Sequence, residues 1–570
     1  MHKQRPLPLN DSPTGVSVSC GERAGSMSFT PRILAVALAV VTLAGCTKVG
    51  TGGSSRNAFT KPGLVRLVDL AEPDSLNPVI GNQQIEANLA SLWGAVLFRW
   101  TDRNTFEPEL ATTLPTLANG GISADGRTIT YHLRSGVTWH DGAPFTASDV
   151  IFSWRAVMNK RNNVASTVGF DLITAIDRTD DQTIVVHLKS RWAPFVATFF
   201  GPSSTPIVIL PEHLLAKYPD INSVAYNSAP IGTGPYTVDR WQRGSKIVFR
   251  AYPHYWRGAP KVGQIWYTPI PNQNTIVTIL RSHGADLEYR GGTATYEQLK
   301  NIPGYATRLT PFTTYGQSGL NLKSPKLADV AVRRALWEAL NTNELLRNVS
   351  HGVNTVAFTD QPPFLWAYNP NVTHYPYDPA KARTTLDAAG WKIGTDGIRA
   401  KNGVRLSLDM GNAAGSANGN AIAVVAQRNW HDVGIETTVK NYTTSLFFAS
   451  FGAGGILQTG KFDVAFYSWE NGVDPDDSTL WMCDQMPPGG QNIYHYCNHE
   501  LDAQEHLALG SYDQAVRKKA YDRIQAILAT DVPTVLTWYD RQISVVNTDL
   551  KNFKPPHAQS SFWNAYEWEI

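Results

Sequence analysis

Segments with strand periodicity alternate with segments of helical periodicity along this chain, which predicts an α/β protein. The clearest case lies within residues 125–157. Residues 128–133 alternate polar and apolar side chains, which is the period of a half-buried strand. Thr146 and Asp149 then have the spacing of a capping box, and apolar residues recur at helical spacing over 150–157. At 570 residues, the chain is long enough for more than one domain.

Further strands and helices are expected from the same two periodicities and from capping residues. Asp329 and Asp378 are expected to cap helices, and Gly390 and Gly434 to end them. The expected strands cover 64–70, 177–188 as a pair, 462–469 and 534–538. The expected helices cover 85–98, which runs into a short strand, and 330–340, 379–389, 422–433 and 516–528.

The composition is that of a globular protein, with 42% apolar and 17% charged residues. A net charge of +2 gives no general attraction to nucleic acid or to anionic membranes, so no nucleic-acid partner is expected. The 17 tryptophans fit two interpretations, core packing or a ligand cleft lined with aromatic rings.

The N-terminal region has the pattern of a bacterial lipoprotein signal. Residues 33–45 form an apolar run that is too short to span a bilayer, and Cys46 follows it directly. We therefore expect residues 1–46 to be a signal segment, Cys46 to be lipidated, and residues 47–59 to form a flexible tether rich in small polar residues. Met27 is a plausible true start of the chain, because the residues before it are unusual for a signal.

Several motifs occur in a fixed order and together carry a family resemblance. They are LR-x-G-V-x-W-H-D-G-x-P-x-T-A-x-D-V at 133–150, EPDSLNP at 72–78, GTGPY at 232–236, YPHYW at 252–256 and VRRAL at 332–336. This order resembles the family 5 extracellular solute-binding proteins, the peptide- and nickel-binding group that serves ABC importers. The resemblance extends from about Leu64 to the C-terminus.

The resemblance implies a fold of two α/β lobes, like that of periplasmic binding proteins, joined by a hinge that closes on a solute. One lobe would comprise 60–98, 232–312 and 539–570, with an inserted subdomain at 99–231, and the other lobe would comprise 313–538. We interpret GTGPY as a structural turn, because no G-x-x-x-x-G-K-[ST] pattern follows that would bind phosphate. His140 and Asp141 are expected to fix a turn, and Arg333 is expected to be a structural ion-pair partner.

The resemblance also implies ligand-binding residues. Peptide binders of this family carry an aspartate three residues after the tryptophan of the cleft-lining segment, and it pairs with the α-amino group of the ligand. This chain has Gly472 there, or Asn471 if the loop is one residue shorter. Either residue removes a charge-assisted hydrogen bond worth about 1.5–3 kcal/mol, unless Glu470 or Asp474 substitutes. The residues expected to contact ligand are Asn82, Gln84, Val168 at the rim of the inserted subdomain, Trp469, Glu470, Asn471 and Asp474.

Two cysteines remain once Cys20 and Cys46 are set aside with the N-terminal region. Cys483 and Cys497 form an even pair in a chain that is expected to be exported, and the resemblance implies a disulfide here. Closing a loop of this length contributes about 3 kcal/mol in the chain-entropy model. Two free thiols are the alternative. A metal site is not expected, because the pair lacks ligand spacing.

No catalytic pattern is present: there is no G-x-S-x-G, and Ala503 interrupts the H-E-x-x-H pattern that begins at His499. We therefore expect no enzyme activity and no cofactor. The expected function is capture of an oligopeptide or similar small solute by a monomer, lipid-anchored at the periplasmic or extracellular face of the membrane, for an ABC permease and ATPase. The alternatives are a sugar, opine or metal chelate as solute, or a lipoprotein sensor or chaperone without transport.

Overall fold

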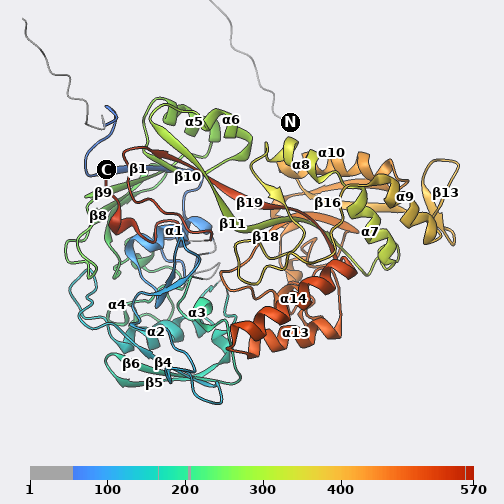
Figure 1. The fold of residues 1–570 in the computed structure, drawn as a ribbon. Helices are drawn as coiled ribbons and strands as arrows, with labels where there is room; N and C mark the ends of the chain where they lie inside the picture. The colour runs from blue at the N-terminus through green and yellow to red at the C-terminus, as the bar shows by residue number, and fades with distance from the viewer. Residues whose placement is uncertain (1–55, 82, 165, 203–206, 559) are drawn as a thin grey trace, which may run out of the picture. The chain divides into compact units, whose positions relative to one another are not determined.

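The computed structural model describes residues 56–570, except Asn82, Ala165, residues 203–206 and Gln559 (Figure 1). The expected signal segment, its Cys46 and most of the expected tether lie outside the described residues. Within the part that the structure describes, no helix combines the length and the apolar character that a bilayer span requires.

One large mixed sheet dominates the fold, and its two longest strands lie side by side at its centre (Figure 1). These are β11 and β19, which pair antiparallel. β1 pairs in parallel with β9 and β10 on one side, and β16 pairs in parallel with β17 and β18 on the other. In sheet order, the strands are β17 (Glu436–Tyr442), β16 (Ser407–Ala413), β18 (Val464–Glu470), β11 (Tyr305–Leu320), β19 (Thr534–Asn547), β10 (Leu287–Gly291), β1 (Leu64–Asp69), β9 (Gln264–Pro269), β8 (Lys246–Ala251) and β7 (Tyr236–Gln242), with β12 (Thr355–Val356) also paired to β19.

Three small sheets accompany the large one. The first, in the order β4-β6-β5, contains the strand expected from residues 128–133. Its strands are β4 (Thr128–His132), β6 (Thr183–Leu188) and β5 (Ile173–Asp180). The others are a hairpin of β2 (Phe98–Trp100) and β3 (Phe106–Pro108), and the set β13 (Lys392–Ile393), β14 (Arg399–Lys401) and β15 (Val404–Arg405).

Helices begin and end at capping residues that the sequence indicates. α2 (Ala147–Met158) has the expected capping box of Thr146 and Asp149, and Asp329 and Asp378 cap α7 (Val330–Ala339) and α9 (Pro379–Ala388). The other α-helices are α1 (Gln84–Trp93), α3 (Phe195–Thr198), α4 (Glu212–Leu215), α5 (Gln273–Arg281), α6 (Tyr296–Leu299), α8 (Thr342–Val349), α10 (Ala417–His431), α11 (Thr444–Phe447), α12 (Ser478–Trp481), α13 (His499–Gly510) and α14 (Gln514–Asp531). Short 3₁₀ turns include Phe170–Leu172, Thr293–Thr295 and Cys483–Gln485.

Two main hydrophobic cores lie on either side of the central strands. One draws on residues 65–289 and 546–568, and the other on residues 315–539. β19 supplies residues within 535–539 to the second core and Val546 to the first, and β11 pairs with it along both stretches. The chain therefore crosses between the cores along this pair of strands. The molecule therefore has the expected two-lobed α/β fold.

Several element boundaries differ from the sequence-based expectation. The helix running into a short strand that is expected over 85–98 is present as α1, which ends at Trp93, and β2, which begins at Phe98. The helix expected over 422–433 begins five residues earlier, at Ala417. The strand expected over 534–538 continues to Asn547. α10 begins where the Ser416 side chain accepts from the Gly419 amide, and α1 ends where Gly94 adopts an extended conformation. β19 continues because residues 541–547 pair with β11, which local periodicity does not reveal.

Arg333 has the expected structural role, but the prediction that it acts through an ion pair is wrong. Its guanidinium donates hydrogen bonds to the main-chain carbonyls of Leu327, Ala328, Asp531 and Val532. The Leu327 and Ala328 carbonyls lie just before α7. The Asp531 carbonyl lies at the end of α14, where helix geometry leaves acceptors without an internal partner. Arg333 therefore joins two helix ends through carbonyl oxygens.

The HDG and GTGPY motifs hold each other in place. The His140 Nε2 donates to the carbonyl of Gly234 at 2.9 Å, and its Nδ1 accepts from the Gly232 amide at 3.2 Å. Burial lowers the pKa of His140 to about 4, so the ring is neutral and each nitrogen keeps one role. A Cβ at Gly232 would lie 1.8 Å from the carbonyl oxygen of Trp93, so only glycine fits. Both motifs are scaffold, as expected.

Candidate functional site

A cavity of about 250 Å³ lies where β11 and β19 cross between the two cores. We call it the crossover cavity. Its walls come from the start of α1, β10, the end of α8, β18, and Trp538 and residues 540–543 of β19, together with Phe312 and Thr314 of β11. Gln84 and Arg290 belong to elements that supply the first core, and Trp538 belongs to the second. Elements of both cores therefore face one space, as a site that closes on a solute requires.

The β11–β19 ladder opens at this point. Pro311 pairs with Arg541 and Tyr315 with Tyr539, so residues 312–314 lie opposite Asp540 alone. A bulge of this kind interrupts the regular hydrogen bonds and turns side chains out of the sheet. The irregular register of the two central strands creates the space of the crossover cavity.

The charged side chains of the crossover cavity are Arg290, Arg541 and Asp540. The Arg290 guanidinium donates to Asp69 at 3.2 Å and to the side-chain oxygen of Gln84. Arg541 donates to the carbonyl of Leu309 at 3.3 Å. Burial raises the pKa of Asp540 to about 6, although hydrogen bonds from Trp538 and Asn354 favour the ionised form.

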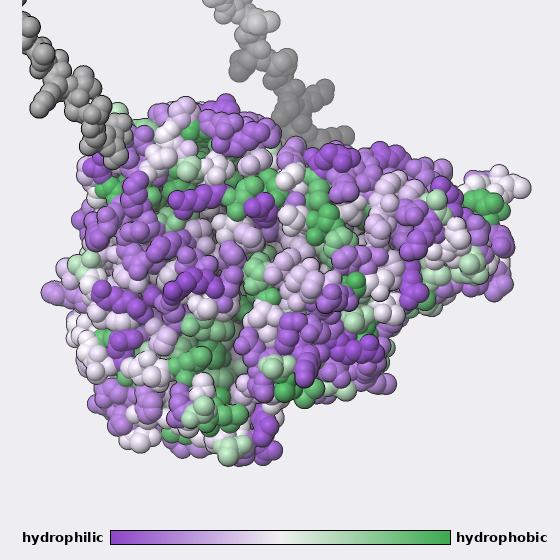
Figure 2. All heavy atoms as spheres, viewed as in Figure 1, coloured by the Kyte–Doolittle hydropathy of each residue, from purple (hydrophilic) through white to green (hydrophobic). Residues whose placement is uncertain are grey.

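A second cavity, of about 540 Å³, lies between residues 100–122 and 193–196 on one side and the segment 511–517 on the other. We call it the apolar cavity. Figure 2 shows apolar surface gathered beside α3 and α13, where this cavity opens. Asp474 reaches its wall together with Arg517, and the guanidinium holds both carboxylate oxygens at 2.8 and 2.6 Å. Arg517 therefore neutralises Asp474.

The segment that follows β18, which is expected to bind ligand, lies beside the bulge of β11. Glu470 and Trp469 pair with Thr314 and Tyr315, and the Asn471 amide donates to the carbonyl of Thr313 at 3.2 Å. Ser468, on the same face of β18 as Glu470, lines the crossover cavity. This segment therefore lies next to the cavity.

The expected ligand residues are not gathered in one place. Gln84 lines the crossover cavity and Asp474 lines the apolar cavity. Trp469 packs against two cores, and Asn471 is buried, with its side chain donating to the carbonyl of Asp360 at 2.6 Å. Trp469, Glu470, Asn471 and Val168 line neither cavity, and Val168 is 50% exposed. Asn82 lies outside the described residues.

Sequence reasoning did not single out Arg290 or Asp540. One signal for Asp540 exists in the chain, because Asp540 and Arg541 are adjacent charged residues in a strand that is otherwise uncharged. Polar residues within a buried strand are costly, so they indicate a partner or a cavity. No local pattern marks Arg290 in the same way.

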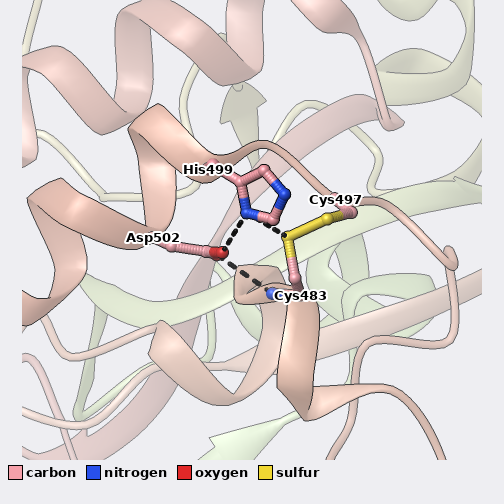
Figure 3. A group of neighbouring side chains, drawn as sticks. All are labelled: Cys483, Cys497, His499 and Asp502. Carbon is pink, nitrogen blue, oxygen red and sulfur yellow. Dashed lines mark hydrogen bonds and ion pairs between the residues drawn. A yellow bond between two sulfur atoms is a disulfide. The ribbon is translucent and has the colours of Figure 1, made fainter.

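A group with ligand atoms suited to metal lies at Cys483, Cys497, His499 and Asp502, whose ligand atoms are all within 4.8 Å of one another (Figure 3). The two sulfur atoms are 2.04 Å apart, in a disulfide. Thiolates, which are the sulfur ligands that bind zinc, are therefore not available here. His499 is 89% exposed on its side chain and lies beside Asp502 at 3.4 Å.

The comparisons with known proteins agree with this architecture. The family model for bacterial extracellular solute-binding proteins, family 5 Middle, matches residues 105–490. Protein XP55 of Streptomyces lividans is 32% identical over 467 residues, covering 81% of this chain and 80% of that protein. The oligopeptide-binding protein AppA of Bacillus subtilis is 24% identical, covering 91% of this chain and 94% of that protein.

Solved structures share the fold. NikZ from Campylobacter jejuni, in complex with Ni(L-His), aligns with a TM-score of 0.75 and 25% identity, covering 90% of this chain and all of that one. NikA from Brucella suis, in complex with Fe(III)-EDTA, aligns with a TM-score of 0.77 and 22% identity, covering 89% of this chain and 99% of that one.

The chain belongs to the family 5 extracellular solute-binding proteins. It is accordingly a binding protein and not an enzyme, as the sequence predicts.

Proposed function

We propose that this protein captures a peptide or a similar small solute in the crossover cavity and delivers it to an ABC permease and its ATPase. The crossover cavity carries this proposal, because side chains on both sides of the two crossing strands line it. Relatives named as oligopeptide- and dipeptide-binding proteins support a peptide as the solute. Other relatives are named for heme or were solved with a nickel complex, so the fold accepts several solute classes.

The proposal includes how the protein is held and how it moves. One lobe comprises 60–98, 232–312 and 539–570 and carries the inserted subdomain 99–231. The other lobe comprises 313–538. The two separate cores support this division. The protein acts as a monomer, anchored by a lipid on Cys46 at the periplasmic or extracellular face of the membrane. Bending of β11 and β19 at the bulge opens and closes the lobes.

Thermal-shift screening of residues 56–570 tests the binding proposal. A bound solute at 100 times its Kd is expected to stabilise the fold by about 2.7 kcal/mol, so a library of tripeptides raises Tm when it contains the solute. Sugar and metal-chelate libraries run beside it. Stabilisation by one of these alone would replace the peptide as the proposed solute and leave solute binding in place.

Removing the disulfide by the double change Cys483→Ser and Cys497→Ser is expected to lower the free energy of unfolding by about 3 kcal/mol, because the unfolded chain regains the freedom of a closed loop. Urea denaturation of the oxidised protein and the variant measures the difference. Wild-type protein with a thiol reductant present is the matched control and should unfold like the variant. Equal stability of all three samples would show that the bridge contributes nothing.

A further inference from the structure

The loop that the disulfide closes ends beside two further side chains of kinds that bind metal ions. Figure 3 shows His499 and Asp502 pointing toward the sulfur of Cys483. The His499 Nδ1 lies 3.8 Å from the Cys483 Sγ and 3.4 Å from a carboxylate oxygen of Asp502, Oδ2. With Cys497 included, one ligand atom from each of the four residues lies within 4.8 Å of the others.

These separations are those of a tetrahedral zinc site. Zinc bonds of about 2.0–2.3 Å place the ligand atoms of a tetrahedron about 3.3–3.8 Å apart. Both distances measured at the His499 Nδ1 fall within this range. Two sulfurs, one imidazole nitrogen and one carboxylate oxygen also complete the four ligands of a closed zinc site. The bond between the two sulfurs removes both thiolates and thereby excludes zinc.

The chain holds both cysteines in place by contacts other than the disulfide. Asn492, which is fully buried, donates to the carbonyls of Met482 and Tyr496 at 3.0 and 2.8 Å. These two residues directly precede the two cysteines. The Tyr496 hydroxyl and the Asn498 side chain both donate to Asp531 at the end of α14, at 2.7 and 3.0 Å. Breaking the S–S bond therefore leaves the two ends of the loop side by side.

Asp502 is oriented as a ligating carboxylate has to be. Its Oδ1 accepts a hydrogen bond from the Cys483 amide at 3.0 Å, and its Oδ2 faces the imidazole. Outer hydrogen bonds of this kind fix the orientation of metal ligands. Asn498 caps α13 through two main-chain amides, which fixes the first turn that carries His499 and Asp502.

The disulfide is open to a dithiol from solvent, because Cys497 and His499 lie on the surface. A thiolate of the dithiol attacks the Cys497 sulfur, the S–S bond breaks, and Cys483 leaves as a thiolate beside His499. The second thiol of the dithiol then attacks the mixed disulfide and releases Cys497, so the dithiol supplies both electrons and becomes a cyclic disulfide. Zinc binds both cysteines as thiolates, and the two thiol protons pass to solvent.

We propose that reduction by a dithiol converts this disulfide into a zinc site, with Cys483, Cys497, His499 and Asp502 as the four ligands. The oxidised protein does not bind zinc here, and zinc in the reduced protein closes the same loop that the disulfide closes. None of the four residues lines the crossover cavity, so the inference stands independently of the solute.

Cobalt(II), a coloured substitute for zinc, tests the inference in residues 56–570, which contain no other cysteine. The protein is reduced with a phosphine, freed of reductant and titrated without oxygen. Reduced protein is expected to bind one cobalt ion per chain with a thiolate-to-cobalt charge-transfer band, and zinc is expected to displace it. Oxidised protein is expected to show no such band. Zinc is also expected to raise the Tm of the reduced protein alone.

Single variants test the other two ligands. His499→Ala and Asp502→Asn are each expected to weaken cobalt binding by the reduced protein at least about tenfold, since even loss of an outer hydrogen bond to a metal ligand costs about that factor. Asp502→Asn keeps an acceptor for the Cys483 amide, so the loop retains its support. His506→Ala removes an exposed histidine of the same helix, and this matched control should leave the affinity unchanged.

Reduced protein in denaturing urea separates a built site from two thiols on a loose chain. The folded protein, followed by near-ultraviolet circular dichroism, is expected to bind cobalt at least about tenfold more tightly than the unfolded chain, because its ligands are already ordered. Equal affinity with and without urea, absence of the charge-transfer band, or full affinity of either single variant would overturn the inference. Each of these results leaves the proposed solute binding standing.

Discussion

Replacing Asp474 with alanine is expected to lower the free energy of unfolding by about 3–5 kcal/mol, because it leaves a buried guanidinium without its counter-charge. Arg517 and Asp474 are 8% and 11% exposed on their side chains, and their contact is bidentate. Arg517 also packs over Trp366, with its central carbon 5.3 Å from the ring centre, so it cannot swing into water without losing this contact. Urea denaturation at pH 7 measures the change.

The double variant Asp474→Ala with Arg517→Met separates the charge from the packing. Removing both partners is expected to recover much of the loss, because no uncompensated charge remains. The exposed pair of Arg523, on the same helix as Arg517, and Glu500 of α13 is a matched control, and Glu500→Ala should change stability little. If Asp474→Ala were no more damaging than Glu500→Ala, the pair would not be buried as the structure has it.

The same pair shows why the ligand site was only partly predictable from sequence. Asp474 was expected to contact ligand as a substitute for the aspartate that this chain lacks three residues after Trp469. The spacing does not reveal that Arg517, distant in the sequence, occupies both of its oxygens. Trp469 and Asn471 were selected by the same reasoning, and they pack inward because β18 alternates its faces next to β11. Gln84, by contrast, does reach the crossover cavity.

Local patterns predicted the fold better than the site. Thr146 with Asp149 specifies a helix start within four residues, so the sequence alone determines it. The crossover cavity instead depends on the register between residues 311–315 and 539–541, which lie more than 200 positions apart. No local signal encodes such a register, and for that reason Asp540 was found only when the two strands were seen together.

A buried group of carboxyl side chains near Asp474 gives the second large effect. Glu505 of α13 is fully buried, and in the described part of the chain neither of its oxygens has a hydrogen-bond donor. Asp477 lies beside it and accepts from the Gln361 side chain at 3.1 Å, and Asp360 accepts from the Trp481 ring nitrogen at 2.9 Å. Burial raises the pKa of both Glu505 and Asp477, and repulsion between these neighbouring carboxylates raises the pKa of Asp477 further.

Stability is therefore expected to fall as the pH rises from about 4.3 to the raised folded pKa of Glu505, about 8. A carboxyl whose pKa is higher in the folded than in the unfolded protein stabilises the fold fully below its unfolded pKa, about 4.3 for glutamate. That contribution is lost as the pH rises through the raised folded pKa. Between these values, each such group lowers the free energy of unfolding by about 1.4 kcal/mol per pH unit. Arg517 is the cation in this region that opposes the shift of Glu505.

Glu505→Gln tests this assignment, because glutamine has the shape of the protonated acid at every pH and brings a donor for Asp477. The variant is expected to match wild-type stability near pH 5 and to exceed it increasingly toward pH 9, measured by urea denaturation across that range. Glu500→Gln on the same helix is the control: a hydrogen bond from Arg523 lowers the pKa of Glu500, so its replacement cannot relieve an alkaline loss. A constant difference in the free energy of unfolding between Glu505→Gln and wild type from pH 5 to pH 9 would contradict the assignment. It would mean that Glu505 keeps the same charge over this range and that the buried carboxyl groups are stabilised by something other than protonation.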